Sequence, residues 1–317
     1  KNTIKMSALI FPGQGSQVVG MGLEFYKNFK IVKQIFKQAD DKLNYSISKL
    51  IIEGPEDKLQ LTQNTQPAIL TVSYSIFKVL KDEFNFDLKL FKYFAGHSLG
   101  EYSALVCSDS LNFTDALYLL HERGKAMQEA VPVGKGTMIA VLGIKTSEII
   151  DLLKKNNNEG VCEIANDNAD GQVIVSGNKE SVLSFQMLLK EKKIKTIPLK
   201  VSAPFHCSLM KPAATKMKDK INNIKFNNPS LEIVNNVTAS PELNIDNIKT
   251  LLVEQIFSTV KWRESIIKMR ETGTKNFVEI GPGKALTGMV KRTIKDANCF
   301  SINSIADIKN LTNEFEK

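Results

Sequence analysis

The residues of this chain best suited to chemistry are Gly96-His97-Ser98-Leu99-Gly100. They follow a short apolar run at 90–95 and precede a helix-like segment that begins at Glu101. This arrangement is typical of a nucleophile elbow, in which a sharp strand-to-helix turn exposes a serine hydroxyl. The two glycines remove Cβ atoms where strand and helix converge. We therefore predict that Ser98 attacks a carbonyl carbon; the alternative is a glycine-lined loop with an ordinary surface serine.

A serine nucleophile needs a general base to take its proton. The chain has three histidines: His97, His121 and His206. His206 lies at a proline-containing junction, in Ala203-Pro204-Phe205-His206, and is the best available base for Ser98. The alternative is a structural histidine whose hydrogen bonds are satisfied within the fold.

The oxyanion formed by attack on a carbonyl needs two N–H donors. The backbone N–H of Leu99, directly after the nucleophile, is one candidate. Gln14 is the other, because it lies in the loop Pro12-Gly13-Gln14-Gly15-Ser16-Gln17 after a predicted strand at 7–11. This loop does not match the dinucleotide fingerprint, since its third glycine comes at position 20 rather than 18.

A serine hydrolase usually orients its histidine with an acidic residue located between serine and histidine in the chain. The acidic candidates in that interval are Asp115, Asp151, Glu163, Asp167 and Asp170. The last four fall within a segment that we predict to be an inserted domain. A neutral carbonyl could hold the ring instead, which would suit an enzyme that excludes water and hands its acyl group onward.

Arg123 lies in a predicted helix at 115–127, within a stripe of small and apolar residues. One interpretation is an ion pair with Glu122 or Glu129 on a solvated face. The apolar setting favours a second interpretation, a buried receptor for an anion.

Strands alternate with helices around the elbow, which is typical of an α/β fold. Apolar residues at helical spacing predict one helix over 24–41 and another that opens at Pro67. From 133 to 202 the predicted order becomes β-α-β-β-α-β, the ferredoxin-like arrangement. We therefore predict a large α/β-hydrolase-like domain with a mostly parallel sheet, formed by 1–132 and 203–317. We predict that residues 133–202 form a ferredoxin-like domain inserted into it.

The composition argues against several other classes of protein. No apolar run approaches the roughly 18–20 residues that span a bilayer. The four cysteines have no C-x-x-C spacing, so we expect no metal site and no disulfide framework. The net charge is +8, but no stripe of interleaved basic and aromatic residues predicts nucleic-acid binding. Gly281-Pro282-Gly283 lacks the spacing of a phosphate loop and predicts a tight turn.

Several of these motifs, with others, resemble those of the malonyl-CoA:acyl-carrier-protein transacylases of type II fatty-acid synthesis, in the same order over about 8–292. They are Phe11-Pro12-Gly13-Gln14-Gly15-Ser16-Gln17, Thr65-Gln66-Pro67-Ala68, Gly96-His97-Ser98-Leu99-Gly100-Glu101-Tyr102-Ser103-Ala104, Glu122-Arg123-Gly124, Ala203-Pro204-Phe205-His206 and Gly281-Pro282-Gly283. The resemblance implies an enzyme that moves malonyl from malonyl-CoA to the phosphopantetheine thiol of acyl carrier protein. It implies no separate cofactor, because the thioesters are substrates.

By the same resemblance, Ser98 carries the malonyl group and His206 acts as general base and acid. The backbone N–H groups of Gln14 and Leu99 are implied as the oxyanion hole. Arg123 is implied to bind the malonyl carboxylate through a two-pronged pair, which its planar fork suits better than lysine.

The resemblance also implies that the backbone carbonyl of Gln255 orients His206 in place of an acidic residue. The chain departs from the family nearby, since it has Ser258-Thr259 where Asn-Pro is common. Three further substrate-binding residues are implied: His97, Asn166 and Asn168.

Two alternatives to a transacylase remain at this stage. A thioesterase or esterase could use the same elbow, but it would have no use for a buried cation that faces the acyl group. A non-catalytic scaffold for carrier protein would not need both Ser98 and His206.

The predicted partners are malonyl-CoA and an acidic carrier protein, which lysines such as those at 190–195 could attract. We expect a monomer that binds neither membrane nor nucleic acid. A chain rich in Lys, Asn and Ile that begins without methionine favours an apicoplast-like plastid stroma in an AT-rich eukaryote, with a bacterial cytoplasm as the alternative.

Overall fold

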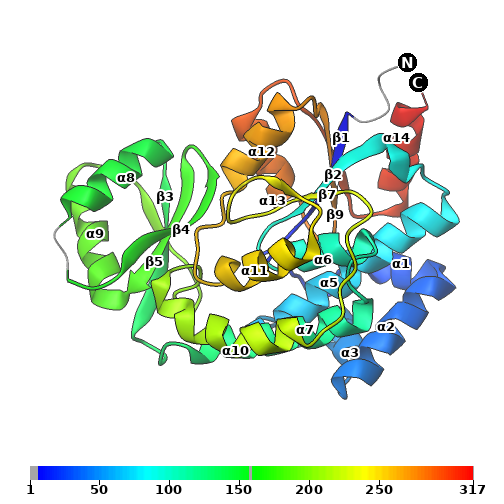
Figure 1. Cartoon of the computed structure of the whole chain (residues 1–317), viewed down its shortest axis with the longest axis horizontal. Coiled ribbons are helices and arrows are strands. Elements are labelled where there is room, and N and C mark those ends of the chain that lie inside the picture. The colour runs from blue at the N-terminus through cyan, green and yellow to red at the C-terminus, as the bar shows by residue number, and fades with distance from the viewer. Residues whose placement is uncertain (1–5, 157–158, 317) are drawn as a thin grey trace.

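The computed structural model describes residues 6–156 and 159–316, whose strands form two separate sheets (Figure 1). The larger sheet contains β1 (Ser7–Phe11), β2 (Phe91–Gly96), β7 (Glu232–Val234), β8 (Pro241–Glu242), β9 (Asn276–Ile280) and β10 (Asn298–Ile302). Its order is β10-β9-β1-β2-β7-β8, and all neighbours run parallel except β7 and β8. The predicted α/β class with a mostly parallel sheet is confirmed.

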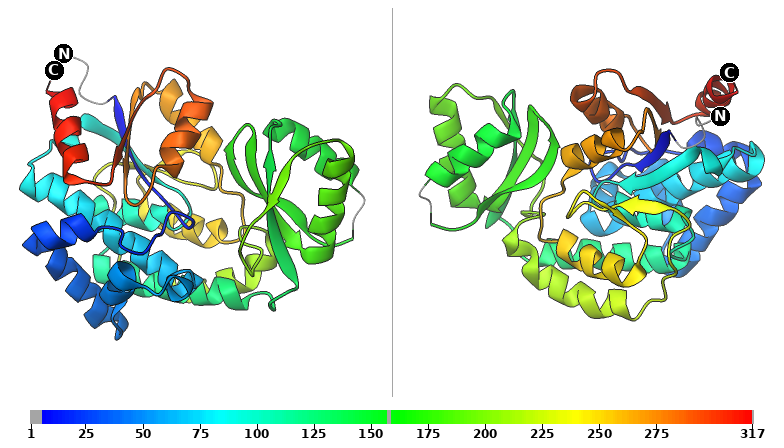
Figure 2. Two further views of the ribbon diagram at one scale, coloured as in Figure 1. Left: turned by 180° about the vertical axis from the view of Figure 1, so that it is seen from behind. Right: turned by 45° about the horizontal axis from the view of Figure 1, so that its top comes forward.

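Helices cover both faces of this sheet (Figure 2). They are α1 (Leu23–Asn28), α2 (Lys30–Leu43), α3 (Ile47–Glu53), α4 (Glu56–Leu59), α5 (Thr62–Lys78), α6 (Gly100–Cys107), α7 (Phe113–Glu129), α10 (Lys211–Asn222), α11 (Ile245–Gln255), α12 (Trp262–Glu271), α13 (Ala285–Thr293) and α14 (Ile305–Phe315). A short π-helix, η2 (Val79–Glu83), and two 3₁₀ helices, η3 (Leu88–Leu90) and η4 (Ser208–Met210), accompany them. Strand β1 shows the two faces: Ala8 and Ile10 pack with α12 and α13, whereas Leu9 and Phe11 join the core that includes α5, α6 and α7. A strand buried on both faces reads as a continuous apolar run, which is why this segment shows no alternation.

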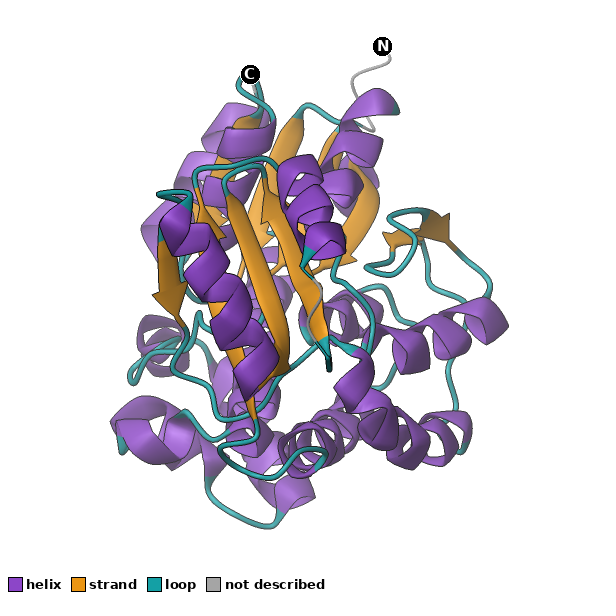
Figure 3. Ribbon diagram, turned by 90° about the vertical axis from the view of Figure 1, so that its left-hand side faces the viewer, coloured by secondary structure: helices purple, strands orange, loops and turns teal. Residues whose placement is uncertain are grey.

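The smaller sheet lies to one side of the larger one and takes its strands from residues 136–198 (Figure 1). Its strands are β3 (Gly136–Leu142), β4 (Cys162–Ala169), β5 (Gln172–Asn178) and β6 (Thr196–Pro198). The order β4-β5-β3-β6 is antiparallel throughout, and α8 (Thr146–Lys155) and α9 (Lys179–Glu191) pack on one face (Figure 3). This is the predicted β-α-β-β-α-β arrangement.

Two helix predictions were wrong in detail. The single helix expected over 24–41 is two helices, α1 and α2, separated by an extended Phe29. Both helices bury apolar residues in the same core, so the periodicity continues through the break.

Pro67 does not open a helix but lies inside α5, which begins at Thr62. Proline has no N–H, so the carbonyl of Gln63 loses its donor in the helix. The ring nitrogen Nδ1 of His121 supplies that hydrogen bond at 3.1 Å. A distant side chain thus makes an internal proline tolerable. None of the helices in the described ranges is long and apolar enough to span a membrane.

Candidate active site

Three strand ends meet at one edge of the larger sheet. The register pairs Phe11 with Gly96 and Ala95 with Val234, so β1, β2 and β7 end side by side. The loop 12–17, the elbow and the residues after β7 therefore face one another. In open α/β sheets this carboxyl edge is where ligands bind.

The elbow has the geometry that its glycines predict. Ser98 has φ of 55°, a left-handed conformation that costs a non-glycine residue free energy. A Cβ on Gly96 would lie 1.9 Å from the carbonyl oxygen of Gly100, and one on Gly100 would lie 2.3 Å from the Phe11 oxygen. Only glycine fits at either position, because strand, turn and helix approach this closely.

Ser98 and His206 are brought together although 108 residues separate them. The distance from Ser98 Oγ to His206 Nε2 is 2.8 Å, and both residues are buried. His206 Nδ1 lies 2.9 Å from the backbone oxygen of Gln255. A carbonyl oxygen only accepts, so Nδ1 carries the proton and Nε2 is free to take one from Ser98.

Burial and the nearby positive charge of Arg123 lower the pKa of His206 to about 3. The ring is therefore neutral, the state that a general base requires. No carboxylate among the described residues hydrogen-bonds this ring. Its acceptor is the neutral backbone carbonyl of Gln255, the contact that the resemblance implies. Ser258-Thr259 does not prevent this arrangement, and the Thr259 hydroxyl donates to the Ile164 carbonyl at 2.6 Å.

Arg123 is buried, with only 1% of its surface exposed. Its Nη1 donates to Gln66 Oε1 at 2.8 Å, and its Nη2 donates to Gln255 Oε1 at 2.7 Å and to Ser98 Oγ at 3.1 Å. The solvated ion pair is therefore wrong: Glu122 pairs with Lys220 and Glu129 with Lys216.

None of the ion pairs formed by the described residues includes Arg123. Its Nε is also buried and has no hydrogen-bond partner within the described ranges of the chain. A buried cation with neutral partners is costly until an anion joins it. The site therefore holds a guanidinium, beside the nucleophile, that an acidic acyl group would satisfy.

The two candidate oxyanion donors lie on facing loops. In the described part of the chain, neither the Leu99 N–H nor the Gln14 N–H donates to a protein acceptor. The loops approach closely, since a Cβ on Gly13 would lie 2.4 Å from the His97 oxygen. Both N–H groups are thus available to a ligand.

His97 and Asn168 are bonded to each other, with 2.7 Å between Nε2 and Oδ1. This contact joins the elbow to β4 of the smaller sheet. Asn166 lies on the same strand, which forms a bridge to Val260. A role of these three residues in substrate binding stays a prediction.

Sequence reasoning missed three buried residues of the site: Gln66, Glu101 and Asn236. Gln66 and Glu101 lie inside two of the motifs shared with the transacylases, but those motifs did not indicate a role for either residue. Gln66 reaches Arg123 because α5 and α7 pack closely at Gly124, where a Cβ would lie 2.6 Å from the Gln63 Cα. Asn236 comes two residues after the end of β7, and a polar residue just past a parallel strand is a signal that could have found it.

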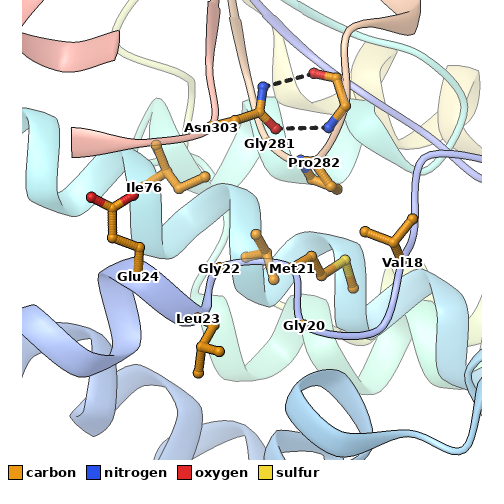
Figure 4. Close-up of a pocket in the computed structure, with 12 residues that line it drawn as sticks. Val18, Gly20, Met21, Gly22, Leu23, Glu24, Ile76, Gly281, Pro282 and Asn303 are labelled. Carbon is orange, nitrogen blue, oxygen red and sulfur yellow. Dashed lines mark hydrogen bonds between the residues drawn. The ribbon is translucent and has the colours of Figure 1, made fainter. Parts of the chain in front are cut away.

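The predicted tight turn at 281–283 packs against the start of the loop 12–17. The Asn303 side chain accepts from the Gly283 N–H at 2.8 Å and donates to its carbonyl at 3.0 Å (Figure 4). A Cβ on Gly281 would lie 2.6 Å from Pro12, so glycine allows the turn to pack there. A cavity of about 220 Å³ adjoins this turn, and its lining includes no residue bonded to Ser98.

Comparison with known proteins agrees with this geometry. The family model described as acyl transferase domain matches residues 8–316. The malonyl CoA-acyl carrier protein transacylase of Haemophilus influenzae is 43% identical, over 98% of this chain and 99% of that protein. The protein of the same name from Bacillus subtilis is 42% identical, over 90% of this chain and 89% of that protein.

Solved structures show the same fold. The crystal structure of an acyl-carrier-protein S-malonyltransferase from Bartonella henselae has a TM-score of 0.95 and 38% identity, covering 98% of this chain and 99% of that one. A malonyl-transacylase in complex with its type II PKS acyl-carrier protein has a TM-score of 0.93 and 38% identity, covering 97% of this chain and 99% of that one. The chain belongs to the acyl transferase family, and within that family to the malonyl CoA-acyl carrier protein transacylases.

Proposed function

We propose that Ser98 carries malonyl as an ester between two transfers, from malonyl-CoA to Ser98 and from Ser98 to the phosphopantetheine thiol of acyl carrier protein. The observation that carries this proposal is Arg123: a buried guanidinium that forms no ion pair with the described residues lies 3.1 Å from the nucleophilic oxygen. Malonyl has a free carboxylate that fits this guanidinium, whereas an uncharged acyl group does not.

In the first transfer, the Ser98 hydroxyl gives its proton to His206 Nε2 while Oγ bonds to the thioester carbon. The N–H groups of Leu99 and Gln14 stabilise the oxyanion. The carbon–sulfur bond then breaks, and the departing thiolate takes the proton from His206. In the second transfer, the carrier-protein thiol gives its proton to His206 and attacks the ester, and Ser98 leaves with that proton.

The substrate carboxylate has a second effect in this scheme. It neutralises Arg123, whose positive charge contributes to the low pKa of His206. The base therefore becomes stronger when an acidic acyl group occupies the site, which favours malonyl over uncharged acyl groups.

The proposal is tested by incubation with labelled malonyl-CoA and mass spectrometry of the peptide that contains Ser98. We expect a malonyl adduct on Ser98, its absence in Ser98→Ala, and its discharge onto added phosphopantetheinylated carrier protein. Failure of the wild-type protein to form the adduct would overturn the mechanism. Release of free malonate without transfer to carrier protein would instead indicate a hydrolase.

We further propose that the carrier protein docks near the end of α9. Four exposed lysines lie there: Lys190, Lys192, Lys193 and Lys195. Their charge complements an acidic partner.

Compartment and oligomeric state stay predictions. The relatives named above are bacterial, which supports a bacterial cytoplasm over the plastid. Fractionation of the source cells decides between these locations. Light scattering decides whether the 35.3 kDa chain is a monomer.

A further inference from the structure

The side chain of Asn236 spans the nucleophile elbow from the β7 side. Its Oδ1 accepts the Ser98 N–H at 2.8 Å, and its Nδ2 donates to the Gly96 carbonyl at 2.8 Å. The residue is fully buried, and it comes two residues after Val234, the last residue of β7. The amide thus continues, with a side chain, the pairing that β2 and β7 make through their backbones.

Ser98 needs such support because its φ of 55° is unfavourable for a residue with a Cβ. Asn236 Oδ1 accepts the Ser98 N–H, and Gln255 Nε2 donates to the Ser98 carbonyl at 3.0 Å. Gln255 Nε2 also donates to Asn236 Oδ1 at 3.2 Å, so the two amides fix each other. With these groups satisfied, the next N–H, that of Leu99, donates to no acceptor among the described residues and stays available to a substrate oxygen.

Asn236 is itself held by Glu101 in the first turn of α6. The Glu101 carboxylate accepts the backbone N–H of Asn236, and only 3% of its surface is exposed. A carboxylate is stabilised near a helix N-terminus. The strand end, the elbow and the helix are therefore joined through one buried asparagine.

We propose that Asn236 is a positioning residue for the transacylase reaction, one that keeps Ser98 in its left-handed conformation so that Oγ faces His206 and the Leu99 N–H faces the oxyanion. The inference rests on the proposed function, because it concerns the acylation of Ser98. Asn236 itself does not touch the reacting atoms.

The test compares Asn236→Ala with Asn235→Ala by rapid-quench measurement of Ser98 malonylation. Asn235 is the matched control. It is also buried, but among the described residues its side chain hydrogen-bonds only within the turn that follows, to Val237, Thr238 and Ser240. We expect Asn236→Ala to acylate about 10- to 100-fold more slowly, with the full amount of Ser98 still acylated and KM for malonyl-CoA little changed. Asn235→Ala should lower the melting temperature but keep the rate per active site.

A smaller acylated fraction at an unchanged rate in Asn236→Ala would overturn the proposal, since it would show only loss of folded protein. The absence of an adduct on the wild-type protein would instead refute the proposed function, so the two failures are distinguishable.

The pH dependence of Ser98 acylation in Asn236→Asp distinguishes a positioning role from a merely structural one. The new carboxyl has the shape of the amide, but when ionised it cannot donate to the Gly96 carbonyl. Protonation restores that donor, so we expect acylation by this variant to recover as the pH falls from 8 to 5, relative to wild type. The same pH profile as wild type would contradict the assignment.

Discussion

Arg123 is the residue that separates acidic from uncharged acyl groups. We expect Arg123→Ala to lose at least about 100-fold in kcat/KM for malonyl-CoA, because a carboxylate would be buried without its partner. Acetyl-CoA should be affected less. Arg123→Lys is the matched control, since it keeps the charge but not the fork, and it should recover only part of the malonyl activity. Steady-state rates with both thioesters check this prediction, and equal losses for both would contradict it.

His206 determines the acid side of the pH profile. Its folded-state pKa of about 3 lies below the ordinary value of 6.5, so the neutral base persists as the pH falls through 6.5. We expect kcat/KM for malonyl-CoA to stay level from pH 8 to about pH 5. A profile measured over this range checks the prediction. A fall centred near 6.5 would show that the ring titrates like an exposed histidine.

Most residues that carry the chemistry could be predicted one by one, but their partners could not. The types and neighbours of Ser98, His206 and Arg123 indicate their chemistry, because each stands in a short motif. The partners of Arg123 could not be inferred, since its contacts with Gln66, Ser98 and Gln255 span 57, 25 and 132 residues.

At the scale of elements, Glu279 of β9 determines how α13 begins. Its carboxylate accepts from the N–H groups of Thr287 at 2.9 Å and Leu286 at 3.3 Å, inside the core. Burial raises its pKa to about 7 from the ordinary value of 4.5. Between these values the unfolded chain has lost the proton and the folded chain has kept it. The contribution of Glu279 to stability is therefore complete below 4.5 and is lost as the pH rises through 7.

We expect Glu279→Gln, which has no such proton, to gain stability relative to wild type by about 1–3 kcal/mol between pH 5 and pH 8. Urea unfolding of both proteins at the two pH values gives this difference. If the difference in unfolding free energy between the two proteins is the same at pH 5 and pH 8, the Glu279 carboxyl does not titrate between these pH values.

The bounds of a helix or strand could be predicted where a local sequence pattern determines them. They were harder to predict where contacts with distant residues determine them. The strand 7–11 was predicted with its observed bounds, because its apolar run is continuous. The start of α5 was missed because a histidine from another helix stabilises an internal proline there.

At the scale of the whole molecule, the net charge of +8 predicts attraction of an acidic carrier protein. We expect kcat/KM for carrier protein to fall several-fold between 50 and 300 mM salt. The rate of Ser98 acylation by malonyl-pantetheine, whose pantetheine portion carries no charge, should change little over the same range. Replacement of Lys190, Lys192, Lys193 and Lys195 with glutamate should abolish the salt effect. The control variant has glutamate in place of four exposed lysines on α2: Lys30, Lys33, Lys37 and Lys42. An unchanged salt effect in the first variant would place docking elsewhere.

The sequence by itself determined the local chemistry: a serine on a turn that only glycines allow, a histidine at a proline junction, and an arginine among apolar neighbours. It also determined the order of strands and helices, because hydrophobic periodicity is a local property. The tertiary structure alone decided that Arg123 forms no ion pair with the described residues, that Gln66 and Gln255 hydrogen-bond its guanidinium, and that Asn236 supports Ser98. Parallel strands joined by long crossovers bring their ends together in space, so residues far apart in the chain become neighbours without a trace in local spacing.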